Sequence, residues 1–205
     1  GGNWPNVANI NPAAFVDGVF SINVWDGTGS ARTITNNIDL SGQGGLVWIK
    51  KRNESSNSDY LLFDTVRGAN KRLRSNTTDR EYSVTEHLNS FTSTGFTLGT
   101  DSPSGPNVSG KEYVAWTFRK KAKFFDIVTW TGDGTSNRTI SHNLGSAPGM
   151  IIAKSRDSST EWMVWHTAMT DDEFLRLNTN GDQGGYGSFY EAGIDSSTIG
   201  VSSTS

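Results

Sequence analysis

An internal repeat limits the fold of this chain more than any other feature of its sequence. The matched ranges are 20–29 with 125–134, 45–52 with 149–156, and 73–77 with 175–179. Both copies keep the same order of motifs with only small gaps between them. A repeat of roughly 100 residues is too long for a solenoid or a propeller and has the size of one β-sandwich domain. We therefore predict two related domains in tandem.

The residue pattern within each copy predicts short β-strands. Residues 20–25 alternate between two faces, which is typical of a half-buried strand. Residues 46–50 form a short, nearly continuous apolar run and predict an interior strand, and residues 113–118 alternate again. The turn signal at 26–29, followed by residues 32–34, predicts a hairpin. Strands at this spacing predict an all-β chain with two tandem antiparallel β-sandwich units.

The second copy lacks a counterpart for one strand of the first. We expect a leader or the end of a preceding domain at 1–19, a first sandwich at 20–119 and a second at 120–205. Residues 197–201 resemble the segment that leads to the strand at 113–118, and no equivalent of that strand follows. The chain is then either a fragment, or another chain or strand completes the unpaired edge.

Composition and charge narrow the possible partners. The 23 glycines indicate many turns, and the 7 Trp and 10 Phe indicate a folded core although only 34% of residues are hydrophobic. A net charge of −3 predicts no nucleic-acid partner. We interpret the basic run at 119–123 as a solvated linker, with a phosphate or partner patch as the alternative. The chain has no Cys and no apolar run of about 20 residues, so we expect no disulfide and no membrane insertion.

We predict no catalytic or metal site and no cofactor. His87, His142 and His166 are not spaced as metal ligands, and we expect them at loops or strand edges. The acidic cluster at 171–173 is too compact to hold a substrate between two carboxylates, and it does not recur between the copies. Its sequence has helix-capping character and predicts one helical turn at most. The chain is therefore predicted not to be an enzyme.

Residues shared by the two copies are expected to stabilise the common fold. Residues that the copies do not share are expected to bind the ligand. The shared pairs are Trp25 with Trp130, Arg32 with Arg138, Lys50 with Lys154, Arg52 with Arg156, and Asn76 with Asn178. A sugar platform on Trp25 or Trp130 is the alternative to core packing. The ligand-binding candidates are Tyr186, Phe189 and Tyr190, because glycines flank these unshared rings and would expose them on a loop.

Several motifs together resemble a known family. They lie at 45–50, 62–68, 73–77, 95–99, 113–118 and 138–152. In combination they look like repeats in structural proteins of tailed bacteriophages, especially phages of cyanobacteria and marine bacteria. The resemblance implies a lectin-like, concanavalin-type jelly-roll sandwich, a place on the virion and other virion proteins as partners. It brings no catalytic residues, and the second copy departs from the pattern because 162–166 lacks the ending seen at 64–68.

These observations lead to one main functional hypothesis and several alternatives. The main hypothesis is a virion structural protein, a tail-fibre segment involved in host attachment, which would be a trimer if it forms a fibre. The first alternative is a carbohydrate-binding, lectin-like module for host-surface polysaccharide. A capsid decoration protein and a capsule depolymerase are the others.

Overall fold

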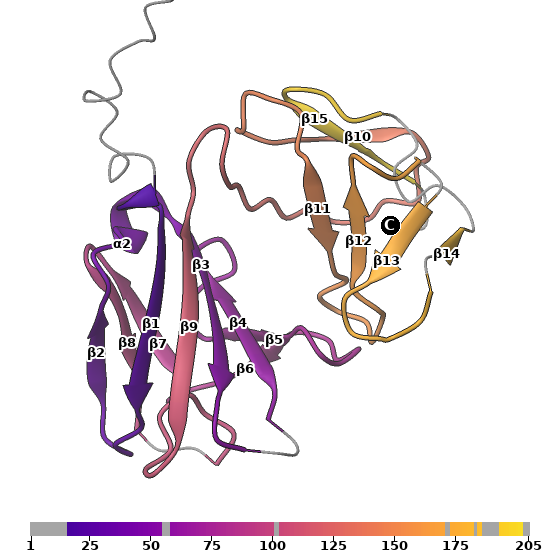
Figure 1. The fold of residues 1–205 in the computed structure, drawn as a ribbon. Helices are drawn as coiled ribbons and strands as arrows, with labels where there is room; N and C mark the ends of the chain where they lie inside the picture. Colours follow the sequence, from indigo (N-terminus) through magenta and orange to yellow (C-terminus); the bar gives the residue numbers. More distant parts are fainter. Residues whose placement is uncertain are drawn as a thin grey trace, which may run out of the picture.

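The protein is all-β, and its strands form several antiparallel sheets (Figure 1). The computed structural model describes residues 16–54, 58–100, 103–170, 173–182, 184–185 and 193–202. In the N-terminal half, residues 16–119, the elements are β1 Phe20–Asp26, β2 Arg32–Thr35, α2 Leu40–Gln43, β3 Gly45–Lys51, β4 Tyr60–Asp64, β5 Lys71–Arg74, β6 Tyr82–Ser83, β7 Leu88–Thr92, β8 Gly95–Leu98 and β9 Glu112–Arg119. In the C-terminal half, residues 120–202, they are β10 Arg138–Ser141, β11 Met150–Ala153, β12 Met163–His166, β13 Glu173–Arg176, β14 Gly184–Gly185 and β15 Thr198–Val201.

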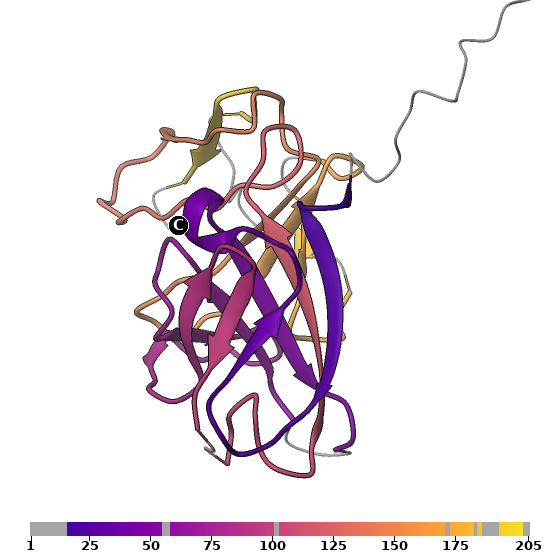
Figure 2. The ribbon, with the colours of Figure 1, turned by 90° about the vertical axis from the view of Figure 1, so that its left-hand side faces the viewer.

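Two sheets pack face to face in the N-terminal half. The larger has the order β1-β9-β3-β4-β5-β6 and the smaller the order β2-β8-β7. Figure 2 views them from the side of the smaller sheet. Alternate residues of the strands point into the space between the sheets, so apolar side chains from both sheets meet there.

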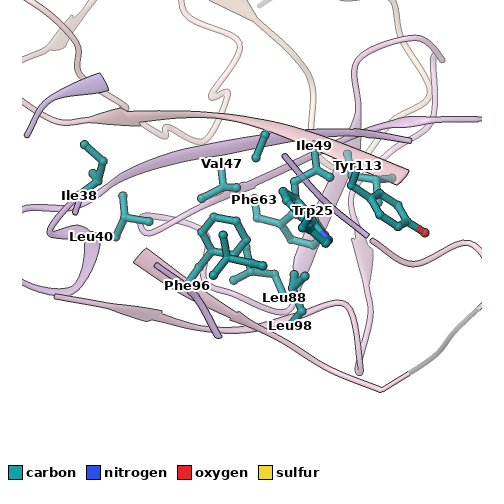
Figure 3. Packing of buried hydrophobic residues seen from close by; sticks show 13 residues of the cluster. Trp25, Ile38, Leu40, Val47, Ile49, Phe63, Leu88, Phe96, Leu98 and Tyr113 are labelled. Carbon is teal, nitrogen blue, oxygen red and sulfur yellow. The ribbon is translucent and has the colours of Figure 1, made fainter. Parts of the chain in front are cut away.

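The core of this half is a cluster of thirteen buried residues (Figure 3). Phe63 from the larger sheet and Phe96 from the smaller are both fully buried. Trp25 stacks on Tyr113 with ring centroids 5.6 Å apart, and its indole N–H donates to the Pro106 carbonyl at 3.2 Å. Each buried large apolar side chain contributes about 1.5–3 kcal/mol, so this cluster is the main source of stability.

The strand pairings of the N-terminal half recur in the C-terminal half in the same register. The matched pairs are β3–β4 with β11–β12, β4–β5 with β12–β13, β5–β6 with β13–β14, and β2–β8 with β10–β15. Even single backbone bonds repeat: Thr65 donates to Gly45, and Thr167 donates to Gly149, both at 3.0 Å. The paired residues are those that the alignment of the two copies matches.

The predicted hairpin between β1 and β2 is wrong. β1 pairs with β9, whereas β2 pairs with β8 in the other sheet. The intervening glycines allow close packing and do not close a ladder. A Cβ on Gly27 would lie 2.0 Å from the Val108 carbonyl oxygen, and the Gly29 N–H donates to the Asn107 carbonyl at 2.8 Å. The turn thus docks on the loop before β9 while the chain crosses between the sheets.

The described helix lies at a place that the sequence patterns did not indicate. α2 is one turn at Leu40–Gln43, with Asp39 capping it by accepting from the Gly42 N–H at 2.8 Å. Of the acidic cluster at 171–173, only Glu173 lies within the described residues. It begins β13, and its side chain accepts from the Thr170 N–H at 2.7 Å.

Candidate functional site

A groove of about 410 Å³ lies where the two halves meet. One wall is the outer face of the large N-terminal sheet. The other wall is formed by β11 and the segment 124–130 of the C-terminal half. Ligand sites in proteins are mostly apolar hollows of about 300–1,000 Å³ with a few polar groups, and the groove has this size and character.

Apolar side chains of β3, β4 and β5 form the N-terminal wall. Leu62 and Leu73 point away from the main core but are buried, because Trp162 of the C-terminal half packs on them. The Trp162 indole N–H donates to the Arg74 carbonyl at 2.9 Å, which fixes the ring across the junction. Leu46 and Trp48 pack beside this cluster and line the open part of the groove.

The C-terminal wall is more exposed. Met150 and Ile152 of β11 are 57% and 39% exposed, although both are large apolar residues. Val128 and Trp130 are half-buried and pack against the small core of Ile140, Ile199 and Val201. The groove therefore exposes apolar side chains that nothing among the described residues covers completely.

A buried ionic network closes one end of the groove and ties the halves together. Arg67 forms an ion pair with Asp64, and its Nη1 lies 3.1 Å from Glu81 Oε2. Arg156 of the C-terminal half donates to the same Glu81 carboxylate at 3.2 and 3.3 Å. The Glu81 N–H donates to the Arg156 carbonyl at 2.8 Å, so the contact includes the backbone.

These contacts set the charge of Glu81. Burial raises the pKa of its carboxyl, but hydrogen bonds from Arg156 and Arg67 and their positive charges outweigh that effect. The pKa consequently lies below its ordinary value, and the carboxylate is ionised at neutral pH. A general acid needs a pKa close to the working pH, so Glu81 is suited to holding the junction rather than to donating a proton.

Asp126, at the other end of the groove, is also held in its charged form. Burial opposes ionisation, but hydrogen bonds from the Asn143 N–H at 2.7 Å and from Lys120 at 2.9 Å lower the pKa below its ordinary value. Lys120 belongs to the basic run at 119–123. The ion pair links that run to the start of the C-terminal half.

Two of the shared pairs make equivalent contacts in the two halves. Asn76 accepts from the Tyr60 N–H, and Asn178 accepts from the Trp162 N–H, both at 2.9 Å. Arg32 and Arg138 each donate to the carbonyl of the residue that directly follows the shared Trp, which is Asp26 in one half and Thr131 in the other. Such contacts stabilise turns and strand ends of the fold.

The shared Trp pair differs between the halves. Trp25 is buried in the core, whereas Trp130 lines the groove. The ligand-binding candidates Tyr186, Phe189 and Tyr190 lie outside the described residues. The groove itself was not predicted from the sequence, because it depends on how the two halves face each other.

The histidines occupy three different environments. His87 is buried next to Phe63, with ring centroids 6.4 Å apart. His142 accepts from the Leu144 N–H at 3.2 Å, and His166 accepts from the Ala168 N–H at 3.0 Å, both in turns. In the part of the chain that the structure describes, no three His, Asp or Glu side chains gather as a metal site would require.

No helix among the described residues is long and apolar enough to cross a membrane.

Comparisons with known proteins identify a family. A family model described as a domain of unknown function, DUF7483, matches residues 17–205. The comparisons with curated proteins and with solved structures gave no match. Because the family model spans both halves and the groove between them, the chain belongs to the DUF7483 family.

Proposed function

We propose that this chain is a structural protein of a bacteriophage virion, a tail-fibre segment involved in host attachment. The observation that carries the proposal is the repetition of four strand pairings in one register, which supports a tandem of two related β units. Tandem units suit a protein that spaces or presents binding surfaces. The resemblance of both copies to phage structural repeats supplies the virion context.

The proposed architecture of each unit is an antiparallel, lectin-like jelly-roll sandwich of the concanavalin type. The two facing sheets of the N-terminal half support it. In the C-terminal half, the sheet β11-β12-β13-β14 and the pair β10–β15 correspond to parts of those sheets. We take this half to be a related unit in which the described residues include no strand equivalent to β9.

Immunogold electron microscopy of the parent particle tests the proposed location. Antibodies against the purified chain are expected to label the tail fibres, with other virion proteins as its partners. Label on the head would instead make the chain a capsid decoration protein. Label away from any virion would contradict the proposal.

Carbohydrate binding is a second candidate function, and the groove favours it. Trp48, Trp130 and Trp162 line one apolar hollow whose rim carries charged side chains, and aromatic faces suit the apolar faces of sugar rings. We expect host-surface polysaccharide to bind the chain in a calorimetric titration. Trp130→Ala should weaken that binding at least about tenfold, whereas Trp116→Ala, on β9 outside the groove, should not.

The aromatic residues singled out from the sequence are an alternative site for the same ligand. If Tyr186 and Tyr190 form the sugar platform, Tyr186→Ala and Tyr190→Ala should abolish binding while Trp130→Ala leaves it intact. No binding across a broad panel of host polysaccharides would contradict carbohydrate recognition at either place.

The proposal also assigns no catalytic activity to the chain. Asp126, which lines the groove, and Glu81, which binds the groove residues Arg67 and Arg156, have lowered pKa values and are engaged by basic side chains. Incubation with host capsule should therefore release no reducing ends. Release of reducing ends would make the chain a depolymerase and contradict this part of the proposal.

A further inference from the structure

β9 is the strand that completes the N-terminal half. It pairs along its length with β1 on one side and with β3 on the other. Tyr113, Ala115 and Thr117 point into the core and are at most 1% exposed. β9 therefore provides both the hydrogen bonds that join two strands and part of the core between the sheets.

The repeat shows where an equivalent strand would lie in the C-terminal half. β3 corresponds to β11, and β1 corresponds to the segment 125–130. Among the described residues, this segment belongs to no sheet, and β11 is the edge strand of its own sheet. Both neighbours of β9 thus have counterparts, but β9 itself has none in the described part of the chain.

The open edge of β11 presents backbone groups ready for pairing. The Thr167 N–H donates to Gly149, which places Gly149, Ile151 and Ala153 toward β12 because bonds alternate along an antiparallel pair. The N–H and C=O groups of Met150 and Ile152 then face the other edge. In the N-terminal half, the equivalent alternate residues along β3 and just after it bond to β9. The Arg52 N–H, for example, donates to the Glu112 carbonyl at 2.7 Å.

The groove follows this edge, and the side chains that would contact a strand line it. Trp130 corresponds to Trp25, whose ring stacks on Tyr113 of β9. Val128 and Ile151 line the groove beside it. On the outer side, Met150 and Ile152 face a hollow whose far wall includes Trp48.

We propose that the edge of β11 is an acceptor site for a β-strand presented by a partner polypeptide. The strand runs antiparallel to β11 and alternates as β9 does, with the positions equivalent to Tyr113 and Ala115 facing Trp130 and Val128. Strand addition to an exposed edge is a recurrent way of binding peptides, with affinity from main-chain bonds and specificity from alternate side chains. This inference goes beyond the proposed function and does not depend on it.

The comparison with β9 indicates that the occupant is a strand rather than an apolar small molecule. An apolar small molecule could cover Met150 and Ile152, but it could not satisfy their backbone groups. A strand satisfies both requirements, and unpaired edges readily recruit further strands. The alternation also requires one register of pairing, since a slip of one residue turns every side chain to the opposite face.

A peptide titration followed by hydrogen exchange tests the proposal. The probe is a synthetic peptide with the sequence of residues 111–120, added to the full chain. We expect saturation at one peptide per chain and at least tenfold slower exchange of the Met150 and Ile152 amides. A control peptide of the same length, with Asp at the positions equivalent to Tyr113 and Ala115, would place charges against Trp130 and Val128 in this register and should give no protection.

Two variants of the acceptor strand distinguish pairing from simple apolar contact. Ile152→Pro removes an N–H on the open edge and no bond to β12, and it should weaken peptide binding about tenfold or more. Ile152→Val keeps the N–H and should bind as the parent chain does. Far-UV circular dichroism identifies any Pro variant that fails to fold, and the control peptide then remains the deciding comparison.

Three results would overturn the inference. The first is unchanged exchange at Met150 and Ile152 in saturating peptide. The second is equal protection by the two peptides, which would indicate contact outside the proposed register. The third is protection that appears without peptide as the chain dimerises, which would make a second copy the occupant. Virion labelling is a separate measurement, so failure here leaves the proposed function to its own test.

Discussion

The two halves of the molecule share four strand pairings but differ in how completely their cores are enclosed. In the N-terminal half, thirteen buried residues from two sheets form one cluster. In the described part of the C-terminal half, the corresponding cluster has three buried residues, with half-buried neighbours around it. The pairings that both halves share thus do not by themselves produce a large core.

The difference follows from β9. That strand lies between β1 and β3, so it holds the sheet together and adds three side chains to the core. Where no equivalent is described, the counterpart of β1 belongs to no sheet and the counterpart of Trp25 is left at a groove. Among the described residues, one strand therefore distinguishes a half with an enclosed core from a half that leaves apolar side chains at a groove.

The largest expected effect comes from removing the same core side chain in each half. Ile34 and Ile140 occupy equivalent positions and are 6% and 7% exposed. Ile34→Ala should cost about 4 kcal/mol and Ile140→Ala about 2 kcal/mol, because the looser surroundings of Ile140 can relax into the space left behind. Urea unfolding followed by hydrogen exchange in each half measures both values. Equal costs would show that the halves are equally well packed.

Acidification should destabilise the N-terminal half selectively, and the expected effect is next in size. Burial, with the charges of Arg72 and Arg74, lowers the pKa of His87 to about 4 from its ordinary 6.5. The unfolded chain binds a proton between these values and the folded chain does not. The contribution of His87 to the free energy of unfolding is therefore fully present above pH 6.5. It falls as the pH drops toward 4, by up to about 3 kcal/mol.

Thermal unfolding between pH 7 and pH 4 measures this loss. His87→Gln should remove most of the pH dependence in that range. Glu81 and Asp126 have lowered pKa values, and their contributions disappear only at lower pH, below the ordinary values of carboxyl groups. A loss of the same size in the Gln variant would assign the effect to another group.

A substitution at the junction between the halves should cause a smaller loss of stability. Glu81→Gln removes the negative charge that Arg67 and Arg156 share, while Arg67 keeps its ion pair with Asp64. We expect a loss of about 2 kcal/mol, less than for a pair left wholly unpartnered. Calorimetry should then resolve two unfolding transitions where the halves had been coupled.

A surface pair gives the matched control for the junction. Glu112 contacts Arg52 at 3.5 Å, and both side chains are about half exposed. Glu112→Gln should change stability by no more than about 0.5 kcal/mol. If the two variants behave alike, the Glu81 network does not couple the halves.

The repeat explains why so much of the fold could be predicted. The apolar run and the alternation predicted the strands at 46–50 and 113–118 correctly, and the repeat matched the first of them to β11 of the second copy. The β1–β2 hairpin failed because a turn signal does not identify the partner of a strand. Gly27 is needed for packing against Val108, which lies far away in the sequence.

The groove could not be predicted by the same reasoning. The Trp162 N–H donates to Asn178 Oδ1, as the Tyr60 N–H donates to Asn76, so the backbone of Trp162 keeps a contact that both halves share. Its ring nevertheless crosses to the other half and bonds to Arg74, a contact that no alignment of the copies contains. The one sequence signal for the site was the missing counterpart of 113–118, which pointed to an open edge but not to its surroundings.

The smallest expected effect tests whether the shared scaffold is equally strong in both halves. Asn76→Ala and Asn178→Ala each remove a side-chain oxygen that accepts from the first residue of the neighbouring strand or the residue preceding it, at 2.9 Å. Each should cost about 1 kcal/mol, as one hydrogen bond typically does. Local hydrogen exchange at Tyr60 and Trp162 measures the two effects separately. A cost at Asn76 with none at Asn178 would mean that the open half holds its strands less firmly even where its contacts match. Equal costs would confine the difference between the halves to the region around β11, where the counterpart of β9 would bind.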